Sequence, residues 1–245
     1  MCTENVIEIR KLIKSFNGIR ILKGIDLNLK HGENIAILGQ SGTGKSVLTK
    51  CIVGLIEADS GTISVLGKDL SIIGFEEVEE LRKKIGYLFQ GGALYDSMTV
   101  RENLEFPIRR TQTLKRNKSE VNTMIEEALE NVGLLDAIDK MPSELSGGMK
   151  KRVGLARTLI LKPRIILYDE PTTGLDPVTS GEISELILEV QEKYNTSSII
   201  ITHDMKCAEI TANRLKLMMD GKFYAEGTFT ELKQSEDKTI NAYFK

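Results

Sequence analysis

The octapeptide Gly39-Gln40-Ser41-Gly42-Thr43-Gly44-Lys45-Ser46 decides the fold class of this 245-residue chain. It follows an apolar run that is predicted to be a buried strand, and it opens a helical pattern. In that context the glycines let successive backbone N–H groups turn toward an anion, and the start of the helix adds partial positive charge. Lys45 can reach the β- and γ-phosphates, and the Ser46 hydroxyl can bind Mg²⁺. The stretch therefore predicts a site for a nucleoside triphosphate.

Short apolar runs alternate with helical patterns along the rest of the chain. The runs predicted to be buried strands lie at residues 34–39, 85–89, 164–168 and 198–202. Residues 6–14 alternate apolar and polar as a half-exposed strand does, and residues 215–219 and 223–227 are predicted to pair around a turn at Asp220-Gly221. Helical patterns occupy residues 45–56, 118–132, 148–161 and 180–194. Strand alternating with helix predicts an α/β fold with a mostly parallel central sheet.

The length fits a single domain, residues 1–245, with two parts. Residues 1–90 and 162–245 are expected to form the sheet core. Residues 91–161 carry little strand signal and are expected to form an inserted helical lobe. Within that lobe, residues 109–118 include five basic and no acidic residues. This run is either a solvated loop or a face turned toward anionic lipid.

Composition argues against several classes of protein. The 33 Lys+Arg and 35 Asp+Glu give a net charge of −2, without the basic excess typical of nucleic-acid binding. No apolar run approaches the ~18–20 residues of a membrane span, and the N-terminus shows no signal-peptide pattern. The three cysteines include no Cys-x-x-Cys pair, which argues against a disulfide framework or a zinc knuckle. We therefore expect a soluble, cytosolic protein without a nucleic-acid partner.

A second acidic element is expected to complete the nucleotide site. The apolar run at residues 164–168 ends in Asp169-Glu170, and strand ends of such sheets meet at the ligand crevice. Asp169 is predicted to hold Mg²⁺. Glu170 points to the other side of the strand and is the candidate base for an attacking water. Taken alone, the pair could also be a solvated strand cap, but its combination with the phosphate loop favours the metal and base roles.

At Leu145-Ser146-Gly147-Gly148-Met149 the sequence resembles the signature of ABC transporter ATPase subunits, and the likeness extends over nearly the whole chain. The resemblance implies an ABC ATPase fold with an N-terminal antiparallel β part and Mg²⁺-dependent ATP hydrolysis. It also implies that two copies sandwich ATP. Ser146, Gly147, Gly148 and Met149 of one copy would then face the γ-phosphate held by the other.

The same resemblance assigns roles to single residues. It places Gln90 on Mg²⁺, His203 on the γ-phosphate beside Lys45 and Glu170, and Asp176 in a loop that faces the opposite site. Phe16 falls where the family stacks a ring on adenine, although packing in the turn at Asn17-Gly18 is the alternative.

Two positions depart from the family pattern. Met149 replaces the usual glutamine, and Val47 follows Ser46 where threonine is common, which leaves the α-phosphate contact to the backbone. Neither departure removes a group that Mg²⁺ or the attacking water requires, so we expect activity.

Residues 89–104 resemble the ATPase of MCE-type (Mla) lipid transporters, as do Met149 and residues 176–181. This implies transport of phospholipid or another lipid across the bacterial envelope. The partners would be integral membrane permease subunits and an MCE-domain lipid-binding subunit, and the chain would lie at the cytoplasmic face of the inner membrane. The alternatives are the ATPase of a small-solute importer and a non-transport member of the superfamily. The latter predicts a second cassette, a coiled-coil insertion or a basic groove.

Overall fold

Two β-sheets organise the chain, and the computed structural model describes residues 4–111 and 117–244 of it. The first sheet is antiparallel and has the strand order β2-β1-β4-β5. Its strands are β1 (Asn5–Phe16), β2 (Ile19–Lys30), β4 (Ser60–Val65) and β5 (Lys68–Asp69). The strand predicted at residues 6–14 is confirmed within β1, and the antiparallel N-terminal part is present as expected.

The second sheet has the strand order β10-β9-β3-β8-β7-β6. Its strands are β3 (Asn34–Leu38), β6 (Ile85–Leu88), β7 (Ile165–Asp169), β8 (Ser197–Ile201), β9 (Arg214–Met219) and β10 (Lys222–Gly227). Neighbouring strands are parallel except for β10, which pairs antiparallel with β9. Each predicted short apolar run is a strand of this sheet. The α/β fold with a mostly parallel central sheet is therefore confirmed.

Helices pack against both faces of the second sheet. Outside the region between β6 and β7 they are α1 (Lys45–Ile52), α2 (Phe75–Arg82), α6 (Pro177–Tyr194), α7 (Met205–Thr211), α8 (Phe229–Lys233) and α9 (Lys238–Asn241). The helix predicted at residues 45–56 ends earlier, because Gly54 turns the chain with a φ of 68°. The helix predicted at residues 180–194 begins earlier, because Asp176 caps it. Among the described residues, no helix combines the length and the apolar character needed to cross a bilayer.

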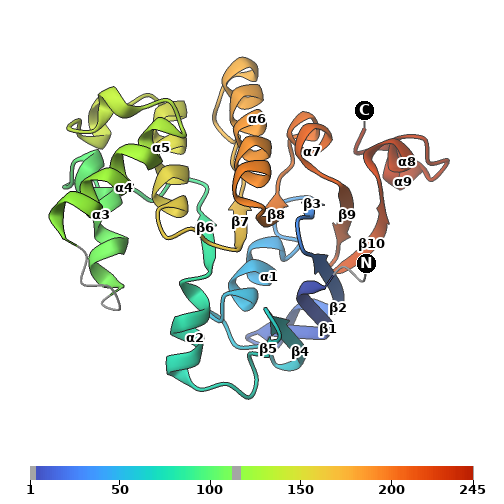
Figure 1. Cartoon of the computed structure of the whole chain (residues 1–245). Helices are drawn as coiled ribbons and strands as arrows, with labels where there is room; N and C mark the ends of the chain where they lie inside the picture. Colours follow the sequence, from blue (N-terminus) through green and yellow to red (C-terminus); the bar gives the residue numbers. More distant parts are fainter. Residues whose placement is uncertain (1–3, 112–116, 245) are drawn as a thin grey trace.

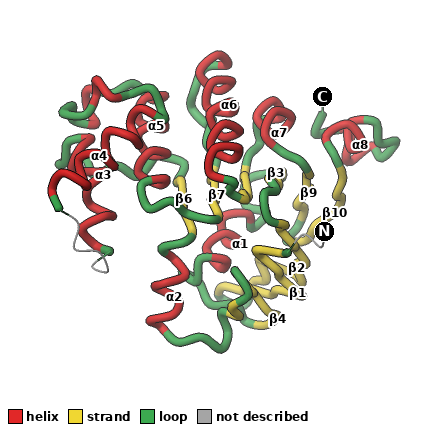
Figure 2. Tube along the Cα trace, viewed as in Figure 1, coloured by secondary structure: helices red, strands yellow, loops and turns green. Residues whose placement is uncertain are grey.

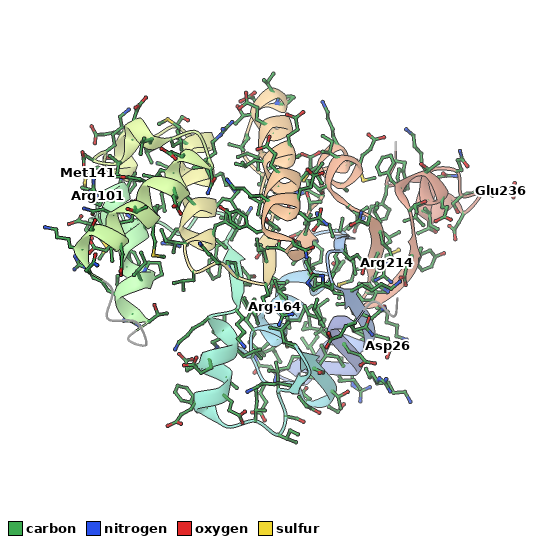
Figure 3. The ribbon with its side chains drawn as sticks, in the orientation of Figure 1. Asp26, Arg101, Met141, Arg164, Arg214 and Glu236 are labelled. Carbon is green, nitrogen blue, oxygen red and sulfur yellow. The ribbon has the colours of Figure 1, made fainter. Side chains whose placement is uncertain are left out.

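The region between β6 and β7 is helical where the structure describes it. It contains α3 (Val100–Arg110), α4 (Lys118–Glu130), α5 (Gly147–Leu159) and 3₁₀ turns at Leu135–Ala137 and Pro142–Glu144. These elements lie together at one side of the molecule (Figure 1), and Figure 2 shows no strand among them. Arg101 and Met141, labelled in Figure 3, belong to this part. Residues 112–116 of the basic run lie outside the described residues, and the lobe boundaries 91–161 stay a prediction.

Strand β7 shows why its sequence is continuously apolar. Ile165 and Leu167 are fully buried in a core shared with α1 and the first sheet. Ile166 and Tyr168 are fully buried in a core shared with α5 and α6. Because successive side chains of a strand point to opposite faces, both faces of β7 are covered. The polar side chains at its end are thereby held at the edge where the phosphate loop also lies.

Candidate nucleotide site

The loop between β3 and α1 borders a cavity of about 770 Å³. Thirteen residues predicted for the site line it: Phe16, Gly39, Gln40, Ser41, Gly42, Gly44, Lys45, Ser46, Val47, Gln90, Asp169, Glu170 and His203. Thr43 is outside the lining, and its hydroxyl donates to the carbonyl oxygen of Gln40 at 3.0 Å. The fold thus brings together residues from five separate parts of the sequence around a space that opens onto the phosphate loop.

Two glycines of the loop are required by close approach of neighbouring groups. A Cβ atom at Gly39 would lie 2.5 Å from the carbonyl oxygen of Met218. Gly44, which precedes α1, has a φ of 106°, and a Cβ there would lie 2.9 Å from Leu22 Cδ2. Larger side chains at these two positions would therefore displace the loop that lines the cavity.

Lys45 is buried at the base of the loop, with an exposed fraction of 8%. Its Nζ donates to the carbonyl oxygens of Gly39 at 2.6 Å and Gln40 at 2.9 Å. Burial lowers the pKa of Lys45, while the nearby charges of Glu170 and Asp169 oppose that shift. The ammonium group is therefore held at the base of the phosphate loop by carbonyl oxygens of the loop itself.

Ser46 and Asp169 approach one another across the cavity floor. The Ser46 hydroxyl lies 3.5 Å from Asp169 Oδ1, and Gln90 lines the same space. Burial raises the pKa of Asp169, while a hydrogen bond from Tyr87 opposes the shift. A hydroxyl, a carboxylate and an amide oxygen are hard ligands of the kind that Mg²⁺ takes together with substrate phosphates. The residues present fit that ion.

Glu170 faces His203 at the carboxyl end of the sheet. Its backbone N donates to the carbonyl oxygen of Ile201 at 2.9 Å, and its φ of 53° is unusual for a residue other than glycine. The Oε2 atom lies 2.7 Å from Nδ1 of His203 and accepts from the Thr173 hydroxyl at 3.0 Å. The carboxylate is thus fixed by two side chains, and it lines the cavity beside the phosphate loop.

Some contributing residues were not predicted from the sequence. The Tyr87 hydroxyl lies 3.3 Å from Asp169 Oδ2 and 2.9 Å from the Thr49 hydroxyl. Lys151 of α5 is 6% exposed, and its Nζ donates to the carbonyl oxygens of Gln90 and Glu170. Burial lowers the pKa of Lys151. No short sequence pattern marks these residues, because their contacts join elements far apart in the chain.

The signature residues lie outside the cavity lining in the single chain. Ser146 caps α5, and its hydroxyl oxygen accepts from the backbone N of Met149 at 3.2 Å. Gly148 packs so closely that a Cβ there would lie 2.6 Å from Thr179 Cγ2. Asp176 caps α6 and accepts from the Thr179 hydroxyl at 2.6 Å. One chain therefore separates these groups from its own phosphate loop, and their roles toward a second copy stay a prediction.

Comparison with known proteins agrees with this geometry. The profile of the family described as "ABC transporter" matches residues 22–173. The intermembrane phospholipid transport ATP-binding protein MlaF of Haemophilus influenzae is 38% identical over 242 residues, which cover 99% of this chain and 91% of that protein. A probable ribonucleotide transport ATP-binding protein, mkl, of Mycobacterium leprae is 37% identical over 97% of this chain and 68% of its own length.

A methionine import ATP-binding protein, MetN, of Carboxydothermus hydrogenoformans is 39% identical over 93% of this chain and 67% of its own length. Among solved structures, a dimeric ATP-binding cassette in a post-hydrolysis state with ADP and Pi superposes with a TM-score of 0.83 at 30% identity. The match covers 91% of this chain and 98% of that one. The phosphate loop, the acidic strand end and His203 surround one cavity, as the family match leads one to expect. This chain belongs to the ABC transporter family and is one of its ATP-hydrolysing, ATP-binding subunits.

Proposed function

We propose that this chain powers a transporter of phospholipid or a related lipid in a bacterial envelope, as two copies that sandwich ATP. The observation that carries the sandwich is the separation of Ser146 and Gly148 from the cavity of their own chain. The lipid class is supported by residues 89–104 and by the 38% identity with MlaF over nearly the full length of both chains. A small-solute importer is the second candidate, favoured by the 39% identity with MetN.

In this proposal the cradle binds the ATP phosphates through backbone N–H groups, Lys45 and Ser46. Phe16, 42% exposed at the cavity edge, offers its ring to adenine. Ser46, Gln90 and Asp169 would hold Mg²⁺, which neutralises charge on the β- and γ-phosphates. The signature of the second copy closes the site and excludes bulk water.

Glu170 then orients one water molecule in line with the γ-phosphorus. As the water oxygen attacks, the Glu170 carboxylate accepts its proton, the bond to the bridging oxygen of ADP breaks, and phosphate leaves. His203 keeps the carboxylate in place through its Nδ1, and Lys45 stabilises charge on the transferring group. Each step uses groups that border the same cavity.

A groove of about 750 Å³ between the sheet core and the helices of residues 100–159 is the proposed contact for a permease subunit. It is lined by aromatic and basic side chains, among them Phe89, Tyr95, Phe106, Arg110 and Arg157. Phe89 is 39% exposed and directly precedes Gln90, so a partner seated there would touch the segment that reaches the metal site. In this proposal the chain lies at the cytoplasmic face of the inner membrane, bound to its permease subunit.

Co-purification of the tagged full-length chain from detergent-solubilised membranes tests the substrate class. We expect an integral permease together with an MCE-domain subunit. Recovery of a permease with a solute-binding protein instead would replace the lipid proposal with the importer. A variant with Phe89→Asp should lose the permease while still binding the nucleotide in EDTA, and Ile72→Asp, an exposed apolar residue outside this groove, is its control.

A further inference from the structure

Tyr87 is a single side chain that reaches both the nucleotide site and the groove. It lies in β6, just before Gln90 of the nucleotide site, and its own side chain lines the groove. Its hydroxyl contacts Asp169 and Thr49, while its ring stacks on Phe89 with centroids 4.2 Å apart and planes 28° apart. The residue therefore spans the distance between the proposed partner surface and the metal-binding carboxylate.

The direction of the hydrogen bonds follows from the chemistry of the groups. The Asp169 carboxylate only accepts when ionised, so the Tyr87 hydroxyl donates to Oδ2 at 3.3 Å. Since the Tyr87 hydroxyl has one proton, it accepts from Thr49 across 2.9 Å, and Thr49 shares its own proton between Tyr87 and the carbonyl oxygen of Ser46 at 3.2 Å. Burial raises the pKa of Tyr87 to about 12, which keeps this proton in place at neutral pH. The chain Thr49–Tyr87–Asp169 thus ties the phosphate-loop helix α1 to the strand end of β7.

We propose that Tyr87 positions the Asp169 carboxylate for Mg²⁺ and transmits to it the state of the groove through the stacked ring of Phe89. With Oδ2 held by Tyr87, Oδ1 faces the Ser46 hydroxyl at 3.5 Å, so both ligands are aligned before the ion binds. Displacement of Phe89 by an occupant of the groove moves the Tyr87 ring and loosens that alignment. The link to the groove rests on the proposed function, in which a permease subunit binds in the groove.

Reciprocity follows from this coupling. If an occupant of the groove changes the affinity for Mg²⁺–nucleotide, then Mg²⁺–nucleotide changes the affinity for that occupant by the same factor. Tyr87 is a positioning residue in this account, because it acts through Asp169 and contacts neither ATP nor the reacting water.

The test compares Tyr87→Phe with Tyr224→Phe in the full chain. Both variants remove a tyrosine hydroxyl that donates to an aspartate, since Tyr224 donates to Asp237 Oδ2 at 2.7 Å on the exposed strand β10. Binding of a fluorescent, non-hydrolysable ATP analogue is titrated with excess Mg²⁺ and again with EDTA. We expect Tyr87→Phe to bind the analogue normally in EDTA. The Mg²⁺ gain, which is the ratio of the affinity with Mg²⁺ to the affinity in EDTA, should be about threefold to tenfold smaller than in the parent. Tyr224→Phe should match the parent in both conditions.

An equal Mg²⁺ gain in Tyr87→Phe and the parent would overturn the proposal, as would an equal loss with and without Mg²⁺. Phe89→Leu should reduce the Mg²⁺ gain in the same direction, and an unchanged gain would overturn the link to the groove. Failure of the parent chain itself to bind the analogue is a different result, because it would contradict the proposed function and not the role of Tyr87.

Discussion

The Nδ1 atom of His203 lies 2.7 Å from the Oε2 atom of Glu170. The two residues follow β8 and β7, which are adjacent parallel strands, so their side chains emerge at the same sheet edge. Because an ionised carboxylate only accepts hydrogen bonds, Nδ1 carries the proton of this contact. The histidine therefore fixes the orientation of the carboxylate that is proposed to receive the proton of the attacking water.

Loss of the His203 ring should affect turnover more than binding. In His203→Ala the Glu170 carboxylate loses the imidazole partner and keeps the Thr173 hydroxyl and the backbone N of residue 203, so its orientation is less well fixed. We expect kcat for ATP hydrolysis to fall about 10- to 100-fold, with ATP affinity changed less than about threefold. His31→Ala, at the other histidine, is the control. Normal turnover by His203→Ala would contradict the positioning role.

Removal of the buried ammonium of Lys45 should act on binding. Lys45→Met keeps the length and the apolar stem but removes the charge that faces the phosphates. Isothermal titration should show a loss of about 10- to 100-fold in ATP affinity. Lys50→Met, an exposed lysine on the same helix, should bind as the parent does. Equal affinities for the two variants would mean that the loop holds no phosphate through Lys45.

The signature serine can be separated from its capping role by a matched variant. Ser146 caps α5 and Thr99 caps α3, each through a side-chain oxygen that accepts a backbone N–H. Ser146→Ala and Thr99→Ala should both lower the free energy of unfolding by about 1 kcal/mol, measured with urea. Ser146→Ala alone should lower ATPase activity, because only Ser146 is proposed to meet the γ-phosphate of a second copy. Equal ATPase activity in both variants would contradict the role at the γ-phosphate and leave Ser146 with a helix-capping role alone.

An ion-pair cluster between β9 and β10 makes stability depend on pH. Glu226 lies 2.5 Å from Lys216 Nζ and 2.5 Å from Arg214 Nη1, which is labelled in Figure 3. Burial alone would raise the pKa of Glu226, but hydrogen bonds and charge from Lys216 and Arg214 outweigh it and hold that pKa below its usual value. A lowered carboxyl pKa stabilises the fold above the ordinary glutamate value of about 4.3, and the contribution is lost as pH falls through the folded value.

Glu226→Gln should therefore lower the Tm at pH 7, where it also leaves the buried Lys216 without this carboxylate. The gap between variant and parent should close as the pH falls below about 4. Thermal melts across this range check the sign, with the exposed Glu185→Gln as control. A gap that widens on acidification would refute the assignment.

Buried strands and the phosphate loop could be predicted because the pattern that identifies each of them lies in consecutive residues. Strand β7 is covered on both faces, so its apolar run is unbroken and its terminal carboxylates stand out. Helix α2 was not predicted, since Leu81 is the one residue of this short helix that is fully buried. Strands β2 and β4 were likewise not assigned individually.

Part of the site could not be predicted because it depends on contacts between distant residues. Tyr87 reads as an ordinary strand residue until β6 and β7 pair and bring its hydroxyl to Asp169. Lys151 reads as a solvated helix lysine until α5 packs beside the strand ends and buries it. Conversely, the family resemblance predicts that Asp176 and Ser146 face the ATP site of a second copy. Within one chain these two residues cap helices.

The central claim is that Glu170 drives hydrolysis in an ATP sandwich. Its most direct test measures the rate of phosphate release and, by light scattering, the oligomeric state of the Glu170→Gln variant. The parent chain should release phosphate in MgATP. The variant should bind ATP with similar affinity, release phosphate at least about 100-fold more slowly and accumulate as a dimer in MgATP. The exposed Glu185→Gln should behave as the parent. Brisk phosphate release by Glu170→Gln, or a monomer at saturating MgATP, would contradict the account.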